Sequence, residues 1–345
     1  MVEVAPRSGP LRIHIKSCLV FLFLLLLLLL GILYSMFGTS WGASNSIIES
    51  ARRYLSIINK FRPSAKPQND LKSALRVHCV ESIGVKRYAL YFSMTDSNSE
   101  PVLAFSPSEI SLSVGDLGAS RKPVIVDKVT PLHMFNQWNE RLFFSAIMDY
   151  SGSMFAEDIE NIKKNCSGLT NGILFPFQAN VIKFSGSVDE RIPLTADKTK
   201  IESAICDGYP IGDSTSLYNA IDQGLTAIQS QPHMRFLLAT TDGNDNSSSI
   251  SLDETVRRLK LHGVSAFIFG FGWLKVEVLK KIAEDTDGFY IYTPDSSELS
   301  SWFPKLAKII NNIQVLEFST QNDVSIPCTI DLTIKHAGTE MRRTK

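Results

Sequence analysis

From residue 141 to residue 313, the chain alternates between short apolar runs and amphipathic segments. The first run, residues 142–148, is almost free of polar side chains, which is typical of a strand buried on both faces of a parallel sheet. Similar runs occupy residues 181–184, 236–239, 266–271 and 289–292. The amphipathic segments are residues 156–166, 216–229, 252–262 and 276–285, and a last one at 297–313 closes the series. This alternation predicts an α/β fold, with a doubly wound, mostly parallel sheet and helices on both faces.

The sequence on either side of this α/β region has patterns typical of β-strands. Residues 86–93 are rich in aromatic side chains, and residues 110–114 alternate between apolar and polar. Strand-like stretches return at 315–318 and 329–334. We therefore expect a small β-sandwich-like segment at residues 75–130 and C-terminal strands within residues 314–345.

A run of apolar residues near the start of the chain predicts a membrane anchor. Residues 18–37 carry no charge, and an α-helix needs roughly 20 such residues to cross a bilayer. A cleaved secretory signal is the alternative, but its apolar centre is shorter, and Gly38-Thr39-Ser40 matches a cleavage site poorly. Residues 38–74 then form a stalk and linker, because residues 44–61 have helical apolar spacing and residues 62–70 contain two prolines.

The basic residues before the apolar run predict its orientation. Arg7, Arg12 and Lys16 precede the run, so the positive-inside rule places residues 1–17 in the cytoplasm. We expect a single-pass protein of the cell membrane whose C-terminal domain is extracytoplasmic.

Composition excludes several classes of function. Lysine plus arginine and aspartate plus glutamate number 35 each, so no overall basic field points to nucleic acid. The six histidines are scattered, and neither HExxH nor CxxC occurs, so a zinc site has no support. Of the five cysteines, four follow the apolar run, and they either form two disulfides or remain buried thiols: Cys79, Cys166, Cys206 and Cys328.

Three polar loops follow predicted strands or open a predicted helix. The first buried strand ends in Asp149, with Ser151 and Ser153 in the same turn. Residues 212–218 open a helix, and residues 241–245 follow the strand at 236–239. In an open α/β sheet these loops meet at the carboxyl ends of the strands. Ligands that are all oxygen suit a hard divalent cation such as Mg²⁺, and Mn²⁺ accepts the same set.

These loops resemble those of the von Willebrand factor type A (VWA) family. DYSGSM at residues 149–154 resembles the Asp-x-Ser-x-Ser element of that family's metal-ion-dependent adhesion site. STSLYNAI at 214–221 resembles its Thr-x-Leu-Tyr-x-Ala segment, and LLATTDGND at 237–245 resembles its Leu-Leu-Thr-Asp-Gly segment. KKIAEDTDGFYIY at 280–292 resembles its late helix–strand turn, so that the resemblance covers residues 141–313.

The resemblance implies a complete set of metal ligands and a kind of partner. Five positions match those that hold the metal in the family: Asp149, Ser151, Ser153, Thr215 and Asp242. In that family an acidic side chain of a partner protein often supplies the last ligand. Because few protein carboxylates bind the cation directly, it stays electron-poor and attracts an incoming carboxylate.

Several neighbouring residues carry their own expectations. Asp213 stands where many family members have a small residue, and its charge would strengthen metal binding but weaken attraction for an acidic ligand. We expect Tyr150 and Tyr218 to pack against the loops, and Asp245 and Asn246 to be solvated. The flanking β segments resemble an arrangement in some bacterial members of the family, in which Cys79 and Cys328 could meet if both segments share one sandwich.

The function expected from this reading is metal-dependent protein–protein binding or cell adhesion. A metal-independent assembly or scaffold component is the alternative, since an anchor and stalk suit it equally. A metal-dependent hydrolase is less favoured: Ser151 stands where haloacid-dehalogenase phosphatases need an aspartate, and neither a P-loop nor a GxSxG elbow occurs. Lys275 breaks the dinucleotide fingerprint that Gly270-Phe271-Gly272 would begin. Two sequons, at Asn165 and Asn246, match the N-glycosylation pattern.

Overall fold

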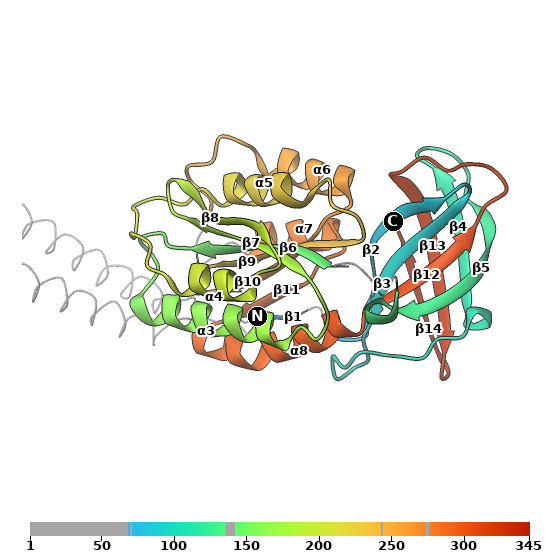
Figure 1. Cartoon of the computed structure of the whole chain (residues 1–345), viewed down its shortest axis with the longest axis horizontal. Coiled ribbons are helices and arrows are strands. Elements are labelled where there is room, and N and C mark those ends of the chain that lie inside the picture. The colour runs from blue at the N-terminus through green and yellow to red at the C-terminus, as the bar shows by residue number, and fades with distance from the viewer. Residues whose placement is uncertain (1–67, 70, 136–141, 243, 273–275) are drawn as a thin grey trace, which may run out of the picture. The chain divides into compact units, whose positions relative to one another are not determined.

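The computed structural model describes residues 68–69, 71–135, 142–242, 244–272 and 276–345 (Figure 1). The chain divides into two units, Met1–Arg62 and Pro63–Lys345, and every described residue lies in the second. The predicted cytoplasmic tail, the apolar run at 18–37 and nearly all of the stalk and linker fall outside the described residues. Within the described part, none of the helices has the length and apolar character needed to span a membrane.

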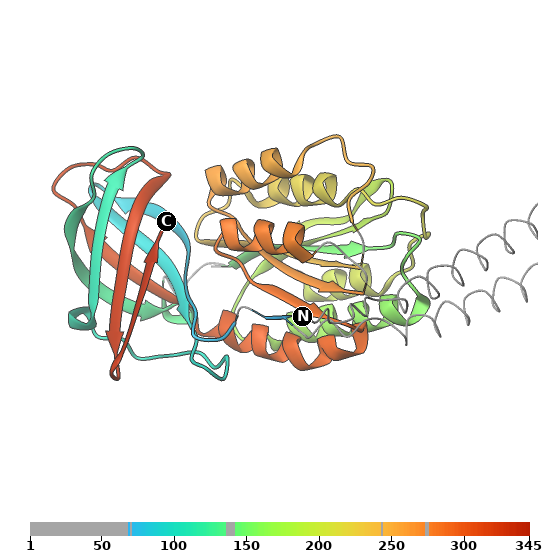
Figure 2. The same cartoon turned by 180° about the vertical axis from the view of Figure 1, so that it is seen from behind.

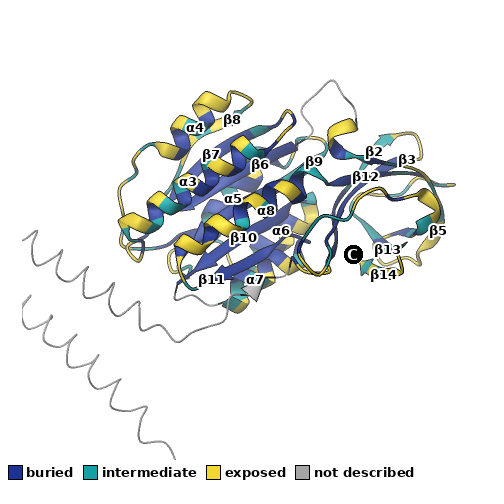
Figure 3. Ribbon diagram, turned by 90° about the horizontal axis from the view of Figure 1, so that it is seen from below, coloured by how far each residue is buried: buried dark blue, intermediate teal, exposed yellow. Residues whose placement is uncertain are grey.

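The α/β region is built on a seven-stranded sheet with the order β1-β11-β10-β9-β6-β7-β8. The five central strands are parallel, whereas the edge strands β1 and β8 are antiparallel to their neighbours. Residues of the central strands are almost all buried (Figure 3). The strands are β1 (Gln68–Asn69), β6 (Leu142–Asp149), β7 (Gln178–Phe184), β8 (Val188–Thr195), β9 (Met234–Thr241), β10 (Ser265–Phe271) and β11 (Tyr290–Thr293).

Helices cover both faces of this sheet, as Figures 1 and 2 show. Apolar residues of α3 (Ala156–Gly172), α4 (Lys198–Cys206) and α8 (Leu299–Asn311) share one core cluster with one face of the strands. The other face packs against α5 (Leu217–Ile228), α6 (Leu252–His262) and α7 (Val276–Asp285). The predicted fold class, a doubly wound, mostly parallel sheet with helices on both faces, is confirmed.

Besides the two-residue edge strand β1, which lies within the predicted linker, two elements of the α/β region have no counterpart in the predicted series. β8 carries DER within a half-exposed strand, so it lacks the apolar run that marks a buried strand. α4 has only nine residues and buries three of them. A third difference is length, since α3 continues six residues beyond the predicted end at Cys166. All three depend on edge or surface positions, where the apolar pattern is weak.

A second sheet has seven antiparallel strands in the order β14-β13-β4-β5-β12-β3-β2. Segments from before and after the α/β region alternate in it, because β4 pairs with β13 and β12 lies between β5 and β3. Its strands enclose one apolar core. They are β2 (Leu75–Gly84), β3 (Arg87–Met94), β4 (Ile110–Asp116), β5 (Lys122–Pro131), β12 (Gln314–Ser319), β13 (Cys328–His336) and β14 (Thr339–Thr344).

Side chains of the second sheet contact the α/β sheet at the amino ends of its parallel strands. His78 of β2 is fully buried, and its Nδ1 lies 3.3 Å from Ser265 Oγ of β10. Glu81, also of β2, accepts a hydrogen bond of 2.8 Å from the backbone N–H of His233, just before β9. These contacts are at the opposite end of the parallel strands from the three polar loops.

The four cysteines after the apolar run are free thiols in the described structure. Cys79 and Cys328 line the same small pocket, of about 70 Å³, but they are not bonded to each other. Burial raises the pKa of each of these two thiols to about 11.

Candidate metal centre

The first polar loop starts where β6 ends, at Asp149. This carboxylate is completely buried. It accepts hydrogen bonds from the backbone N–H of Ser151 at 2.7 Å and from Thr241 Oγ1 at 2.5 Å, the latter at the end of the neighbouring strand β9. Burial raises the pKa of Asp149, although these hydrogen bonds oppose the shift. A cation beside Asp149 would favour its charged form and relieve the cost of burying it.

Two hydroxyls and a second carboxylate join this loop to the loop after β9. Ser153 Oγ donates a hydrogen bond of 2.7 Å to Asp242 Oδ1, and Ser151 Oγ lies 3.2 Å from Ser153 Oγ. Ser151 and Asp242 are buried, whereas Ser153 is exposed. The structure thus brings together four of the five candidate ligands.

Thr215, the fifth candidate, is held nearby through the backbone of its own loop. Gly212 of this loop forms a β-bridge with Ser151 and donates from its N–H to the Tyr150 carbonyl at 3.1 Å. A side chain at Gly212 would lie only 2.5 Å from Ser185 Oγ, so glycine is needed for this close approach. Thr215 itself is 4% exposed.

Asp245 and Asn246 form contacts that the sequence analysis did not predict. Asp245 Oδ2 accepts from the backbone N–H of Tyr218 at 3.0 Å, and Asn246 Oδ1 accepts from the N–H of Thr215 at 2.8 Å. Asn246 is exposed, as expected of a solvated residue, and Asp245 is half-buried, but each side chain also accepts a hydrogen bond from a backbone N–H. The N-terminus of α5 needs acceptors for its free N–H groups, and Ser216, its N-cap residue, makes no side-chain capping bond. The acidic and amide side chains that follow Asp242 in the sequence are the signal from which these helix-capping contacts could have been predicted.

The remaining residues around the loops differ in exposure. Tyr150 is buried against Tyr209 with ring centroids 5.4 Å apart, and Tyr218 packs partly buried against the core on the other face. Both tyrosines therefore pack as expected, and burial raises the pKa of each. Asp213 is exposed, so its charge faces solvent.

A buried lysine fixes Asp207 at the end of α4, five residues before the Thr215 loop begins at Gly212. Lys183 of β7 has a fully buried side chain, which donates to the Asp207 carbonyl at 2.6 Å and pairs with the Asp207 carboxylate. Arg191 adds a contact of 2.6 Å to the same carboxylate. Although burial opposes it, hydrogen bonds from Lys183 and Arg191 lower the pKa of Asp207. Lys183 lies inside the apolar run at 181–184, which concealed its role.

The donor chemistry of the candidate centre is oxygen alone, with two carboxylates and three hydroxyls. Such donors fit Mg²⁺ or Mn²⁺, whereas Zn²⁺ is usually held by histidine or cysteine. Across the described ranges, histidine, cysteine, aspartate and glutamate side chains nowhere gather in groups of three or more that could hold a metal ion. Any metal bound at these loops would therefore depend on the serine and threonine hydroxyls.

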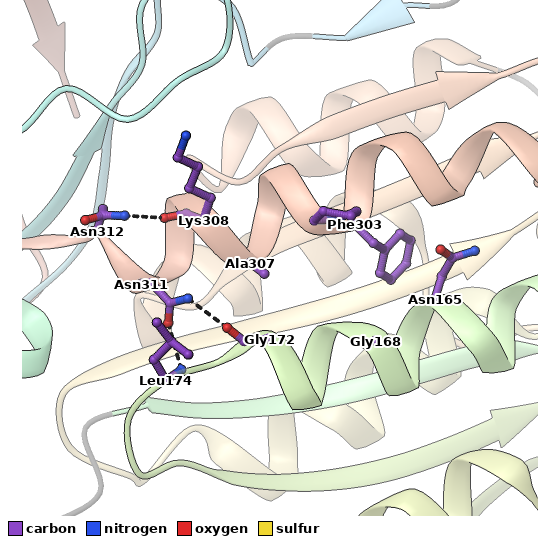
Figure 4. Close-up of a pocket in the computed structure, with 10 residues that line it drawn as sticks. Asn165, Gly168, Gly172, Leu174, Phe303, Ala307, Lys308, Asn311 and Asn312 are labelled. Carbon is purple, nitrogen blue, oxygen red and sulfur yellow. Dashed lines mark hydrogen bonds between the residues drawn. The ribbon is translucent and has the colours of Figure 1, made fainter.

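A separate pocket of about 400 Å³ lies between α3 and α8 and is lined by none of the five candidate ligands (Figure 4). Asn165, the first sequon asparagine, lines it. Its side chain is nearly buried, and its Nδ2 donates to the Asn161 carbonyl at 2.7 Å. The atom that a glycan would modify is thus engaged within the helix.

Comparison with known protein families bears on the α/β region. Residues 145–309 match the sequence profile of the von Willebrand factor type A domain. An uncharacterized protein of Synechocystis sp., sll0103, is 25% identical over 217 residues, which cover 56% of this chain and 50% of that protein. The match thus spans about half the length of this curated relative.

Solved structures are similar at lower identity. Proximal thread matrix protein 1 from the mussel byssus is 16% identical, with a TM-score of 0.48 over 56% of this chain and 51% of that one. A von Willebrand factor type A protein from Catenulispora acidiphila is 11% identical, with a TM-score of 0.46 over 79% of this chain and 74% of that one. On the profile match, the α/β fold and the order of the loops, residues 145–309 of this chain form a von Willebrand factor type A domain.

Proposed function

We propose that the VWA domain binds a divalent cation, Mg²⁺ or Mn²⁺, and uses it to capture a protein partner. The observation that carries the proposal is the hydrogen bond of 2.7 Å from Ser153 Oγ to Asp242 Oδ1, which joins loops from two neighbouring strands beside the buried Asp149. A buried carboxylate with a raised pKa and adjacent hydroxyls is a favourable place for a hard cation.

VWA domains typically mediate protein–protein interactions, and the proposed centre suggests the chemistry of the contact. Its protein ligands carry only two negative charges, so a bound cation would retain affinity for a further carboxylate. We propose that the partner offers an acidic side chain. The exposed Asp213 would weaken this attraction through like charge, so it tunes the affinity of the site for an acidic partner.

The proposed location is the outer face of a cell membrane. The uncharged run at residues 18–37 and the basic residues before it support a single-pass anchor with a cytoplasmic N-terminus. An anchored binding domain on a stalk suits adhesion or the assembly of a surface complex. No catalytic step is assigned to this chain.

The test begins with metal binding by the purified full chain in detergent. After treatment with a chelator, titration with Mg²⁺ in a calorimeter should give saturable heat, and Asp149→Ala should abolish it because the central carboxylate is lost. Asp323→Ala is the matched control, since it removes an exposed carboxylate in the loop between β12 and β13 and should bind Mg²⁺ like the wild type.

The same variants separate metal-dependent capture from a metal-independent scaffold. Partners recovered by cross-linking at the membrane should be lost with chelator and with Asp149→Ala, and retained with Asp323→Ala. Partners that persist through all three treatments would replace the proposal with the scaffold function. The absence of saturable heat from the wild type would also count against it.

A further inference from the structure

Residues 245–249 lie along the start of α5 and are held there by hydrogen bonds. Asn246 contacts Thr215 twice: its Oδ1 accepts from the Thr215 N–H at 2.8 Å, and its own N–H donates to the Thr215 carbonyl at 3.0 Å. Ser247 adds a hydroxyl contact of 2.7 Å to Ser216 Oγ. Asn246 therefore contacts both the N–H and the carbonyl of Thr215.

We call residues 245–249 the clamp, and further contacts extend it along α5. Asp245 Oδ2 accepts from the Tyr218 N–H at 3.0 Å, and Ser248 Oγ accepts from the Asn219 N–H at 3.0 Å. Asn219 Oδ1 in turn accepts from the N–H of Ser249 at 3.1 Å and from its Oγ at 3.2 Å. Because these contacts are farther from Thr215 along the helix, they provide a comparison for the role of Asn246.

The clamp completes a chain of contacts that links the three polar loops of the candidate metal centre. Asp242 is tied to Ser153, and the segment that follows Asp242 is tied through Asn246 to Thr215. The loop of Thr215 returns to Ser151 through the bridge at Gly212. The Thr215 carbonyl also accepts from the N–H of Ser247 at 3.2 Å, whereas the Asn246 side chain alone accepts from the Thr215 N–H. The position of Thr215 relative to the Asp242 loop therefore depends in part on the Asn246 side chain.

We infer that Asn246 is a positioning residue of the metal centre, which fixes Thr215 against the Asp242 loop without being a ligand itself. The inference rests on the proposed function. Mg²⁺ demands near-ideal octahedral geometry at about 2.1 Å, so a small shift of one ligand lowers affinity. Asn246 is itself exposed, so water can replace its hydrogen bond when the side chain is removed. Its loss consequently affects the position of Thr215 more than the stability of the fold.

The test compares three variants of the full chain in detergent by calorimetry with Mg²⁺. Asn246→Ala removes the acceptor for the Thr215 N–H and should weaken Mg²⁺ binding by about three- to tenfold, the equivalent of one hydrogen bond. Asn246→Asp keeps the acceptor oxygen and adds negative charge near the cation, so its affinity should equal or exceed that of the wild type. Ser249→Ala, in the same segment, removes only the hydroxyl contact to Asn219 and should leave affinity unchanged.

Hydrogen exchange without metal provides a second readout. In a metal-free sample, the peptide that contains Thr215 should exchange faster in Asn246→Ala than in the wild type, while Asn246→Asp restores the slow exchange. A merely structural role would lower the thermal midpoint of the metal-free protein without changing Mg²⁺ affinity.

The outcomes separate this inference from the function on which it rests. If the wild type binds Mg²⁺ and Asn246→Ala binds it equally well, the positioning role is overturned and the metal site stands. An Asn246→Asp variant that loses as much affinity as Asn246→Ala also overturns it. If the wild type takes up no Mg²⁺, the proposed function fails and the positioning role fails with it.

Discussion

At the scale of single residues, burial shifts the pKa of two titratable side chains in opposite directions, and each shift favours the neutral form. Asp149 is buried among hydrogen-bond donors, and its pKa is raised by burial. His78 is also fully buried, with Ser93 Oγ 2.9 Å from its Nε2 and Ser265 Oγ 3.3 Å from its Nδ1. Burial, with Lys345 and Arg76 nearby, lowers the pKa of His78 from 6.5 to about 3. The aspartate suits a cation, whereas the histidine is held neutral.

This state of His78 makes the stability of the protein depend on pH. The unfolded chain binds a proton at His78 below pH 6.5, and the folded chain does not do so until about pH 3, so the free energy of unfolding falls as pH falls through this window. Between pH 7 and pH 5 the contribution of His78 is about 2 kcal/mol. Denaturant unfolding at pH 7 and at pH 5 should show that the free energy of unfolding falls less in His78→Asn than in the wild type, by the contribution of His78. An identical loss in variant and wild type would contradict the buried, neutral histidine.

At the scale of elements, α3 and α8 pack closely at one point and leave a pocket at another (Figure 4). A Cβ at Gly172 would lie 3.0 Å from Ala307 Cβ, whereas a Cβ at Gly168 would meet nothing within 4 Å. Asn311 of α8 donates from Nδ2 to the Gly172 carbonyl at 2.8 Å, and its Oδ1 accepts from the Leu174 N–H at 2.9 Å. The end of α3 is therefore fixed by α8, while Gly168 borders open space.

The two glycines consequently predict opposite effects of the same substitution. Gly168→Ala should raise the free energy of unfolding by about 0.5–1 kcal/mol, because alanine in an exposed helical position costs less conformational entropy than glycine. Gly172→Ala should give no such gain, because its methyl group must displace Ala307. Thermal unfolding of the two variants side by side is the measurement. Equal stabilisation by both would mean that α3 and α8 are less tightly packed than described.

At the scale of the described unit, the last strand connects the two sheets. Arg343 Nε donates to Asp287 Oδ1 at 2.5 Å, and Lys345 Nζ lies 3.2 Å from Asp287 Oδ2 in the turn between α7 and β11. Lys345 Nζ also donates to the carbonyls of Val77 and His78 of β2. The Asp287 side chain is only 3% exposed, and its carboxylate pairs with both of these cations.

Removal of one cation should therefore destabilise the unit. Arg343→Met leaves Asp287 with Lys345 alone and should lower the free energy of unfolding by about 1–3 kcal/mol. Asp287→Asn in the same chain should recover much of the loss, because it removes the buried charge and asparagine tolerates the positive φ of 54° at this position. A double-mutant cycle of denaturant unfolding measures the coupling. Strictly additive effects would show that the pair contributes nothing across the sheets.

The prediction of the fold from sequence depended on local patterns. The central strands are buried on both faces, so they are marked by apolar runs, and α6 and α7 coincide with their predicted bounds. α6 begins after the N-cap Ser251 and ends at Gly263 with φ of +60°, both of which are local signals. Strand β8 and helix α4 lie at an edge or on the surface, where partial exposure removes the pattern.

The candidate ligands could be chosen from the sequence because each follows a recognisable element and lies within a short motif. Asp149, Ser151 and Ser153 share one turn, so their proximity is a local property of the chain. The contacts of Asn246 with Thr215 and of Lys183 with Asp207 join residues 31 and 24 positions apart. The first needs two loops to meet, and the second needs a lysine to be buried in a strand that reads as apolar. Short-range sequence pattern thus determined the α/β layers and the candidate ligands. The contacts that hold those ligands in place, and the pairing of β4 with β13, were decided only by the tertiary structure, because they join segments that are distant in the sequence.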